Sequence, residues 1–139
     1  MQYWKDDKEP IAYFLKMLEA AIKEKEMSDS LKKLNQLIQF DYTEDGPDCA
    51  WWWDTRGGEI KYGAGKAEGP PDLVMSLSAD DAHRSWSNKL NPVIAITRKK
   101  IRVKGSATGL LKLAPKLKKV AEIYERVLRA EGRDDLVLT

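Results

Sequence analysis

The single histidine of the chain follows two acids, an order that could provide a general base oriented by a carboxylate. His83 comes after Asp80 and Asp81, and such a base acts only when its geometry is fixed. Residues two positions apart on a helix, such as Asp81 and His83, do not face each other. We therefore interpret His83 as a surface or boundary residue. The two aspartates are interpreted as N-terminal caps of a helix rather than as an acid–base pair.

Other residue types that serve nucleophilic, metal or phosphate chemistry are poorly placed. Cys49 follows Asp48, and a neighbouring carboxylate disfavours the thiolate that a nucleophile needs. The glycines of residues 63–69 have the wrong spacing for a phosphate loop, and Pro70 and Pro71 follow where a helix should begin. One cysteine and one histidine cannot form the usual zinc site. We expect no enzyme activity, no catalytic residue, no metal and no cofactor.

The charges are distributed unevenly along the chain, although the net charge is only +2. Residues 41–81 contain ten acids and three bases, whereas residues 98–121 contain nine bases and no acid. A basic block of this kind forms a solvated face or meets an anionic partner. That partner would be nucleic acid, a membrane surface, or a ligand with a phosphate or carboxylate group.

Aromatic residues are the most informative apolar feature of the sequence. The chain has five tryptophans, and three of them are consecutive. On a strand, Trp51 and Trp53 share one face and Trp52 lies on the other. Large apolar patches are rarely left exposed, so both faces of this strand need a cover. A leucine-rich final helix that a proline interrupts is suited to act as a movable cover.

The length and composition predict one soluble domain. The chain has 139 residues, of which 42% are hydrophobic and 33% charged. No stretch without a charged residue exceeds eight residues, whereas a transmembrane helix needs about 20 apolar residues. The charges of residues 5–9 argue against a secretory signal there. The lone cysteine argues against a disulfide framework, so we expect a cytoplasmic location.

Hydrophobic periodicity predicts helices near both ends of the chain and strands between them. Apolar residues three and four apart predict a helix over 10–26 and another over 106–130, which Pro115 must interrupt. A short helix around Leu31 follows the first helix, and a further helix begins near Ser78. The expected strands are residues 36–43, 50–54, 59–63, 73–78 and 101–105.

In their order and spacing, these segments resemble the sterol carrier protein-2 family of lipid-binding domains over residues 31–128. The resemblance is carried by Leu34–Thr43, Trp51–Gly58, Leu73–Asp81, Leu90–Pro92 and Ile101–Gly105 with the leucine-rich helix that follows. It implies an α+β fold with a five-stranded mixed sheet, covered on one face by helices and preceded here by an extra N-terminal helix. It also implies a short helix at residues 93–97. Strand propensity and the preceding Asn91-Pro92 helix start leave that segment open.

The same resemblance predicts how the chain is divided. We expect an N-terminal helical extension over residues 1–30, packed on a lipid-binding domain over residues 31–130. Residues 131–139 are expected to form a tail.

The resemblance implies non-covalent binding of a fatty acid, a fatty acyl-CoA or a sterol-like lipid in an apolar tunnel between sheet and helices. Lipid sites are mostly apolar with few polar groups. The residues expected to line the tunnel are Phe40, Trp53, Met75, Leu77, Trp86, Ile94, Val103, Leu110, Leu113 and Leu117. The surface expected to meet an anionic partner, an anionic membrane included, is Lys99, Lys100, Arg102 and Lys104.

Two other interpretations stay open. In the first, a module with this fold uses its tryptophan face or its final helix to form a homodimer or to dock on an enzyme that it serves. In the second, the basic block binds nucleic acid with help from aromatic stacking. The acidic middle of the chain would repel a phosphate backbone, so we do not expect nucleic acid as a partner.

Overall fold

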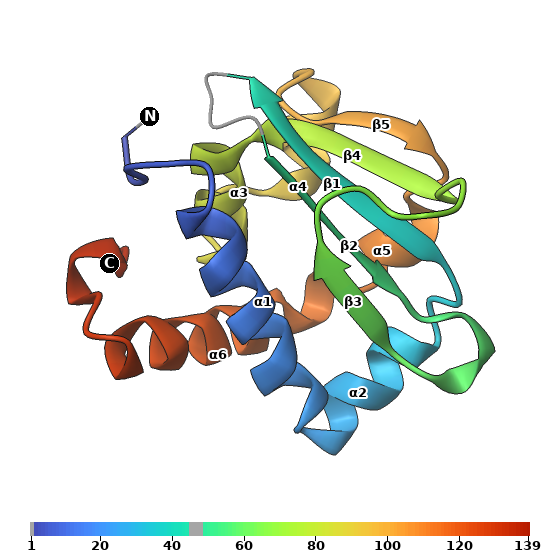
Figure 1. Ribbon diagram of the computed structural model, residues 1–139, viewed down its shortest axis with the longest axis horizontal. Coiled ribbons are helices and arrows are strands. Elements are labelled where there is room, and N and C mark those ends of the chain that lie inside the picture. Colours follow the sequence, from blue (N-terminus) through green and yellow to red (C-terminus); the bar gives the residue numbers. More distant parts are fainter. Residues whose placement is uncertain (1, 45–48) are drawn as a thin grey trace.

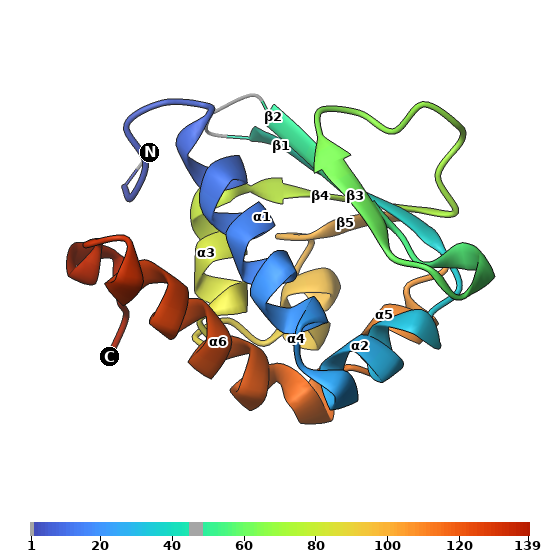
Figure 2. The same ribbon diagram turned by 60° about the horizontal axis from the view of Figure 1, so that its bottom comes forward.

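The computed structural model describes residues 2–44 and 49–139, in which helices pack on one face of a five-stranded mixed sheet (Figures 1 and 2). This is the α+β fold expected from the sequence. The strands are β1 (Leu37–Glu44), β2 (Cys49–Asp54), β3 (Lys61–Ala64), β4 (Leu73–Ser78) and β5 (Arg102–Gly105). The helices are α1 (Glu9–Ile22), α2 (Lys25–Lys32), α3 (Ala79–Trp86), α4 (Pro92–Thr97), α5 (Thr108–Leu111) and α6 (Leu117–Ala130). Short 3-10 turns are η1 (Arg56–Gly58), η2 (Ala114–Lys116) and η3 (Asp134–Leu136).

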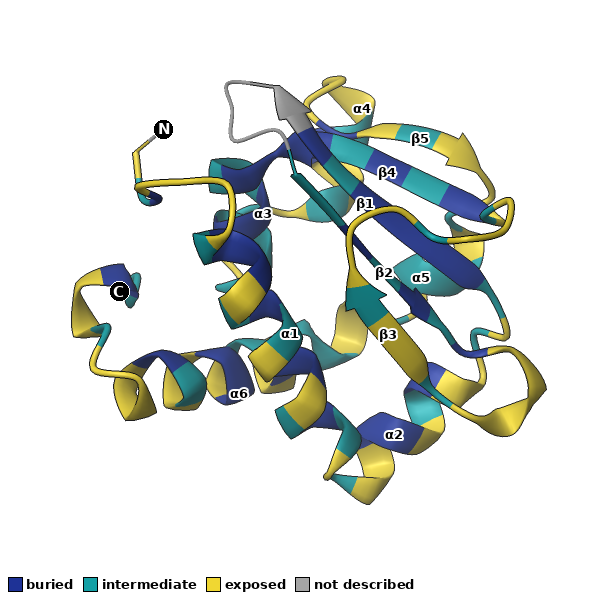
Figure 3. Ribbon diagram, in the orientation of Figure 1, coloured by how far each residue is buried: buried dark blue, intermediate teal, exposed yellow. Residues whose placement is uncertain are grey.

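The sheet has the strand order β3-β2-β1-β4-β5. The central strand β1 runs antiparallel to β2 and parallel to β4, and the two edge pairs are antiparallel. Register places Phe40 opposite Trp51 on one side and Met75 on the other. Because side chains alternate along a strand, these three residues share one face of the sheet. That face lies toward the helices, and its three residues are buried; Figure 3 colours most of β1 and β4 as buried or intermediate.

The opposite face of the sheet is covered by the chain itself. Trp52 lies against Gly63 of β3, where an added Cβ would be 3.0 Å from the indole ring. Gln39 accepts a hydrogen bond from the backbone N–H of Ala67 at 3.0 Å. The connection between β3 and β4 therefore crosses this face, as the green loop in Figure 1 shows. Both faces of β2 are thus covered, as its aromatic residues require.

The N-terminal helix is shorter than the periodicity predicted. Instead of one helix over 10–26, the structure has α1 and α2, separated where Glu24 takes an extended conformation. The charged run after Ile22 offers no apolar residue to continue the buried stripe. The break lets α2 turn so that Met27 and Leu31 reach the core. Glu24 occupies the N-cap position of α2, and Ser28 lies inside the helix.

The predicted interruption of the last helix is confirmed. Four residues form α5, then η2 contains Pro115, and α6 continues to Ala130. Proline has no N–H for the helical hydrogen bond and its ring clashes with the preceding turn. This leaves a broken segment of residues 108–116, which we call the cover segment. The chain just before it is joined to Gln36, the residue before β1, by a hydrogen bond from Gln36 Nε2 to the carbonyl oxygen of Ser106 at 3.3 Å.

Polar caps fix the helices between the strands. Ser78 Oγ accepts from the backbone N–H of Asp81 at 3.0 Å and caps α3. Asn91 Oδ1 accepts from the N–H groups of Val93 and Ile94 and caps α4. The segment left open between strand and helix is therefore helical, because its cap and Pro92 outweigh strand propensity.

Gly105 ends β5 in a conformation that other residues adopt poorly, with φ of +100°. An added Cβ would lie 2.2 Å from the carbonyl oxygen of Asp72. We expect Gly105→Ala to lower the free energy of unfolding by about 2 kcal/mol, since backbone strain and a clash with backbone atoms combine. The matched control is Gly132→Ala, which has φ of +72° and nothing within 4 Å. Urea unfolding that finds equal losses for both variants would contradict this.

Candidate functional site

The only histidine is fully buried rather than at the surface or boundary, so that expectation was wrong. His83 Nδ1 lies 2.7 Å from the Tyr124 hydroxyl, and Nε2 lies 2.8 Å from the carbonyl oxygen of Leu136. Because a carbonyl only accepts, Nε2 carries the proton and Nδ1 accepts from tyrosine. The rings of Tyr3 and Trp4 pack on the imidazole.

This arrangement attaches both ends of the described chain to α3. The Trp4 indole donates to the carbonyl oxygen of Ala79 at 3.2 Å, and Asp80 accepts from the backbone N–H groups of Gln2 and Tyr3. Residues 131–139, expected as a tail, contain η3, and Leu136 is buried. The imidazole has no route to a substrate here. We interpret it as a structural hydrogen-bonding centre.

Burial lowers the pKa of His83 to about 4 from 6.5. In the unfolded chain the imidazole of His83 binds a proton near pH 6.5, whereas in the folded chain it stays neutral down to about pH 4. The contribution of His83 to the free energy of unfolding is therefore fully present above about pH 6.5 and is lost as the pH falls towards 4. The expected loss is about 3 kcal/mol, since one pKa unit corresponds to about 1.4 kcal/mol.

Denaturant unfolding across this pH range, compared with His83→Gln, measures the effect. Glutamine offers a donor and an acceptor but does not titrate, so the variant should lack this part of the pH dependence. Equal pH slopes in the two proteins would show that the histidine is not held neutral.

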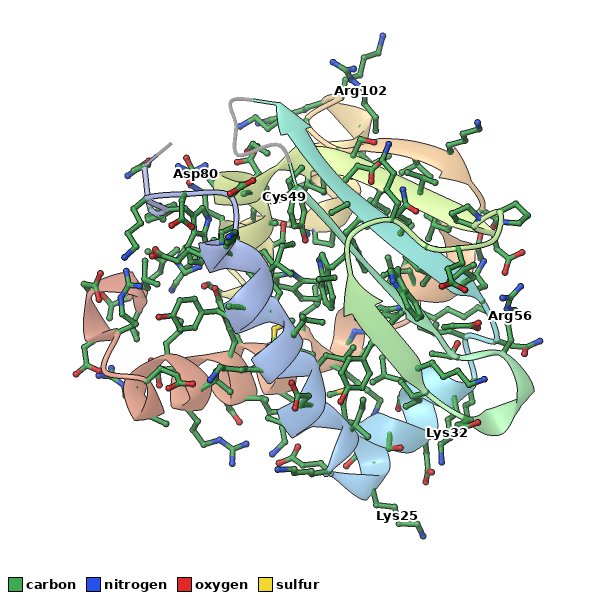
Figure 4. The ribbon with its side chains drawn as sticks, viewed as in Figure 1. Lys25, Lys32, Cys49, Arg56, Asp80 and Arg102 are labelled. Atoms are coloured by element: carbon green, nitrogen blue, oxygen red, sulfur yellow. The ribbon has the colours of Figure 1, made fainter. Side chains whose placement is uncertain are left out.

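The acids before His83 are also structural. Asp81 forms an ion pair with Arg84 at 2.7 Å, and Figure 4 shows Asp80 beside the N-terminal segment. Within residues 2–44 and 49–139, no group of three or more His, Cys, Asp or Glu side chains is placed to hold a metal ion. In the same two stretches, no helix is both long and apolar enough to cross a membrane.

An apolar cavity lies between the helix-covered face of the sheet and the helices. Its volume is about 80 Å³. The sheet contributes residues of β1 and β4, α3 forms one wall, and the cover segment with the start of α6 closes it. The lining residues are Phe40, Tyr42, Met75, Leu77, Ala82, Ser85, Trp86, Pro92, Ile101, Leu110, Leu111, Leu113, Ala114, Leu117 and Val120.

Most of the residues expected to line a tunnel lie at this cavity. The seven that do are Phe40, Met75, Leu77, Trp86, Leu110, Leu113 and Leu117. Trp53 is buried beside it, in ring contact with Phe40 and Trp86. Val103 of β5 is half-buried and pairs with Met75 but does not reach the cavity. Ile94 is 49% exposed, because α4 turns Ala95 inward instead. Contact with a lipid stays a prediction for all ten.

Sequence reasoning missed several lining residues for identifiable reasons. Tyr42 continues the inward alternation of Phe40, and that signal was available in the sequence. Ala82 and Ser85 are small and give no strong apolar signal. Pro92 and Ile101 were interpreted as a helix start and a strand start, and only the packing of α4 brings them to the cavity.

The cavity wall is almost entirely hydrocarbon. None of the lining residues carries a charge. Tyr42 is buried, its hydroxyl accepts from the Trp51 indole at 2.6 Å, and burial raises its pKa. The buried Ser85 Oγ has no hydrogen-bond partner among the described residues. Moving an ionised carboxylate into such a wall costs several kcal/mol unless a partner is present.

The cavity is small in this conformation. At about 80 Å³ it lies well below the roughly 300–1,000 Å³ of small-molecule sites. The cover segment is the part of the wall that could move. Leu110, Leu111 and Leu113 are only half-buried, Ala114 is exposed, and no side chain caps α5. Displacing these leucines would enlarge the cavity without opening the sheet.

The cations expected to meet an anionic partner lie outside the cavity. Lys99 and Lys100 follow α4, and Arg102 and Lys104 belong to β5. All four are exposed, and Figure 4 shows Arg102 extending beyond the upper edge of the sheet. The neighbouring Ile101 is buried, so exposed cations and an inward apolar residue alternate here.

Comparisons with known proteins give one consistent family. A model of the SCP-2 sterol transfer family matches residues 15–132. The hydroxysteroid dehydrogenase-like protein 2 of Bos taurus is 36% identical over 91 residues, covering 63% of this chain and 21% of that protein. The chain thus spans about a fifth of the length of such curated relatives.

Solved structures show the same fold. Sterol carrier protein 2 from Yarrowia lipolytica, in its apo form, superimposes with a TM-score of 0.62 at 20% identity, covering 91% of this chain and 98% of that one. The sterol carrier protein domain 2 of Helicoverpa armigera gives a TM-score of 0.61 at 22% identity, covering 80% and 86%.

Proposed function

The chain belongs to the SCP-2 sterol transfer family, and on that premise we propose that it binds the apolar part of a lipid in its cavity without doing chemistry. The ligand class is a fatty acid, a fatty acyl-CoA or a sterol-like lipid. The observation that carries this proposal is the uncharged hydrocarbon wall closed by the cover segment. The buried histidine, the candidate base of the sequence, lies in a structural hydrogen-bond network and supports a non-catalytic role.

The polarity of the wall specifies how a lipid would be oriented. An ionised carboxylate or a phosphate finds no counter-charge inside, so such a head group stays at the mouth while the chain enters. A neutral hydroxyl or carbonyl group could instead enter and hydrogen-bond to Ser85 Oγ. The basic residues Lys99, Lys100, Arg102 and Lys104 would meet anionic groups outside the cavity.

Quenching of tryptophan fluorescence by a brominated long-chain fatty acid tests the proposal. Trp86 lines the cavity, and Trp51 and Trp53 are in ring contact with it. Bromine quenches on contact, so we expect saturable quenching that Trp86→Phe reduces. A brominated short-chain acid controls for quenching from solution. Quenching no greater than with the short acid would contradict lipid binding in this cavity.

A second candidate function is an accessory module of a larger enzyme. It is favoured by the curated relatives, which are named dehydrogenase-like proteins and are more than three times as long. Trp51 and Trp53 are buried and Trp52 is half-buried, so Trp52 is the residue of that run with surface left for such an interface. A concentration-dependent dimer in analytical ultracentrifugation, combined with no fluorescence quenching, would favour this function.

A further inference from the structure

The short helix α4 presents two aliphatic side chains to solvent. Val93 and Ile94 are each 49% exposed. Among the described residues, the third large apolar side chain that is exposed is Tyr62, at 38%. The buried Ala95 and the Asn91 cap hold α4 against the domain. Figure 3 shows α4 and the turn after it largely in yellow, at the edge of the molecule. Val93 and Ile94 are thus exposed although α4 itself is held against the domain.

The exposed pair is flanked by cations. Lys89 precedes α4, and Arg98, Lys99 and Lys100 follow it, all exposed. None of these four forms an ion pair with a described residue. Acids are absent from the whole sequence stretch 82–121. The α4 tip, defined as Lys89, Val93, Ile94 and Arg98–Lys100, therefore combines an apolar centre with a positive rim.

The α4 tip also borders the cavity. Pro92, the residue before Val93, lines it, and so does Ile101, the residue after Lys100. A surface that rests on the tip would consequently lie next to the part of the cavity wall that Pro92 and Ile101 form. A lipid could then pass between that surface and the cavity over a short path.

We propose that the α4 tip docks on the surface of an anionic lipid bilayer. Val93 and Ile94 enter the boundary between head groups and acyl chains, and the cations meet lipid phosphates. A bilayer supplies both the apolar layer and the negative charge that this pattern needs. Nucleic acid supplies the charge but gives the aliphatic pair no apolar medium. Docking would let a lipid pass between the bilayer and the cavity. This role of the α4 tip rests on the proposed lipid-binding function.

Co-sedimentation with phosphatidylcholine vesicles, with and without phosphatidylglycerol, tests the docking. We expect binding to the anionic vesicles that weakens with salt. Val93→Thr with Ile94→Gln should reduce it about tenfold, because the apolar centre is lost. Arg98→Gln with Lys100→Gln should reduce it about tenfold as well, because two cations are lost. The matched control is Tyr62→Ser with Lys61→Gln on β3, an exposed apolar residue beside a cation. It should bind like the unmodified protein.

Two results would overturn the proposal. One is unchanged vesicle binding in both α4 variants, and the other is retention of duplex DNA or RNA as strong as that of anionic vesicles. Quenching by the brominated fatty acid without vesicles separates the two proposals. The single variants Val93→Thr and Arg98→Gln, which change no residue expected to contact the lipid, should take up this lipid normally. Vesicle binding without any quenching would contradict the proposed cavity function and leave the docking supported.

Discussion

Ala82→Leu should strongly weaken lipid uptake while the protein stays folded. Ala82 lies on α3, is buried and lines the cavity. Leucine adds three carbon atoms to a space of about 80 Å³ and faces the position where an acyl chain would lie. We expect the dissociation constant for a long-chain fatty acid to rise at least about tenfold, equivalent to ~1.4 kcal/mol. Fluorescence titration measures it.

The stability of the same variant must be measured in parallel. Overpacking a core costs about 1–3 kcal/mol, which leaves a typical domain folded. Ala121→Leu is the control, because Ala121 is half-buried on α6 and is not a lining residue. It should bind lipid as the unmodified protein does. Undiminished uptake by Ala82→Leu would show that the lipid binds somewhere else.

Trp51→Ala should remove most of the stability of the domain. Trp51 is fully buried at the centre of the core, in ring contact with Phe40, Phe14 and Trp53. Deleting a buried aromatic side chain costs about 3–5 kcal/mol. The variant also removes the donor to the buried Tyr42 hydroxyl, which adds about 1 kcal/mol or more.

Urea unfolding of two further variants separates these contributions. Trp51→Phe keeps a ring and loses the donor, so it should cost clearly less than the alanine variant. Trp52→Ala removes a half-buried ring from the other face of β2 and should also cost less. A loss for Trp52→Ala equal to that of Trp51→Ala would contradict the assignment of the core to the helix-covered face.

Local patterns in the sequence were sufficient for most of the sheet. The alternation of residues 73–78 predicted β4 with its observed bounds, and that of Ile38, Phe40 and Tyr42 predicted β1. Pro115 predicted the break of the last helix. These signals are local because period-two alternation and proline chemistry act within a few residues.

Long-range packing decided what the sequence could not predict. His83 is buried because Trp4 and Leu136, far from it in the sequence, close over it. The division into an N-terminal extension and a binding domain remains a proposal. The ring of Phe14 on α1 nevertheless contacts Tyr42, Trp51 and Tyr124. Helix α1 is thus packed on the domain and fills its centre.

The sequence predicted which site residues point towards the helices, but not which of them border the cavity. Alternation correctly turned Phe40, Met75 and Leu77 towards the helices, and seven of the ten expected residues reached the cavity. Which inward residues border empty space depends on how α4 and the cover segment pack. A six-residue helix gives too little periodicity to orient Ile94, which is why it points to solvent.

Native mass spectrometry of the freshly purified protein tests lipid binding in the cavity most directly. The spectrum is recorded before extraction with organic solvent, and again after extraction and incubation with a long-chain fatty acid. Binding in the cavity predicts an added mass of one lipid per chain, lost on extraction, regained on incubation and strongly reduced in Ala82→Leu. A bare chain that takes up no fatty acid, acyl-CoA or sterol would contradict it.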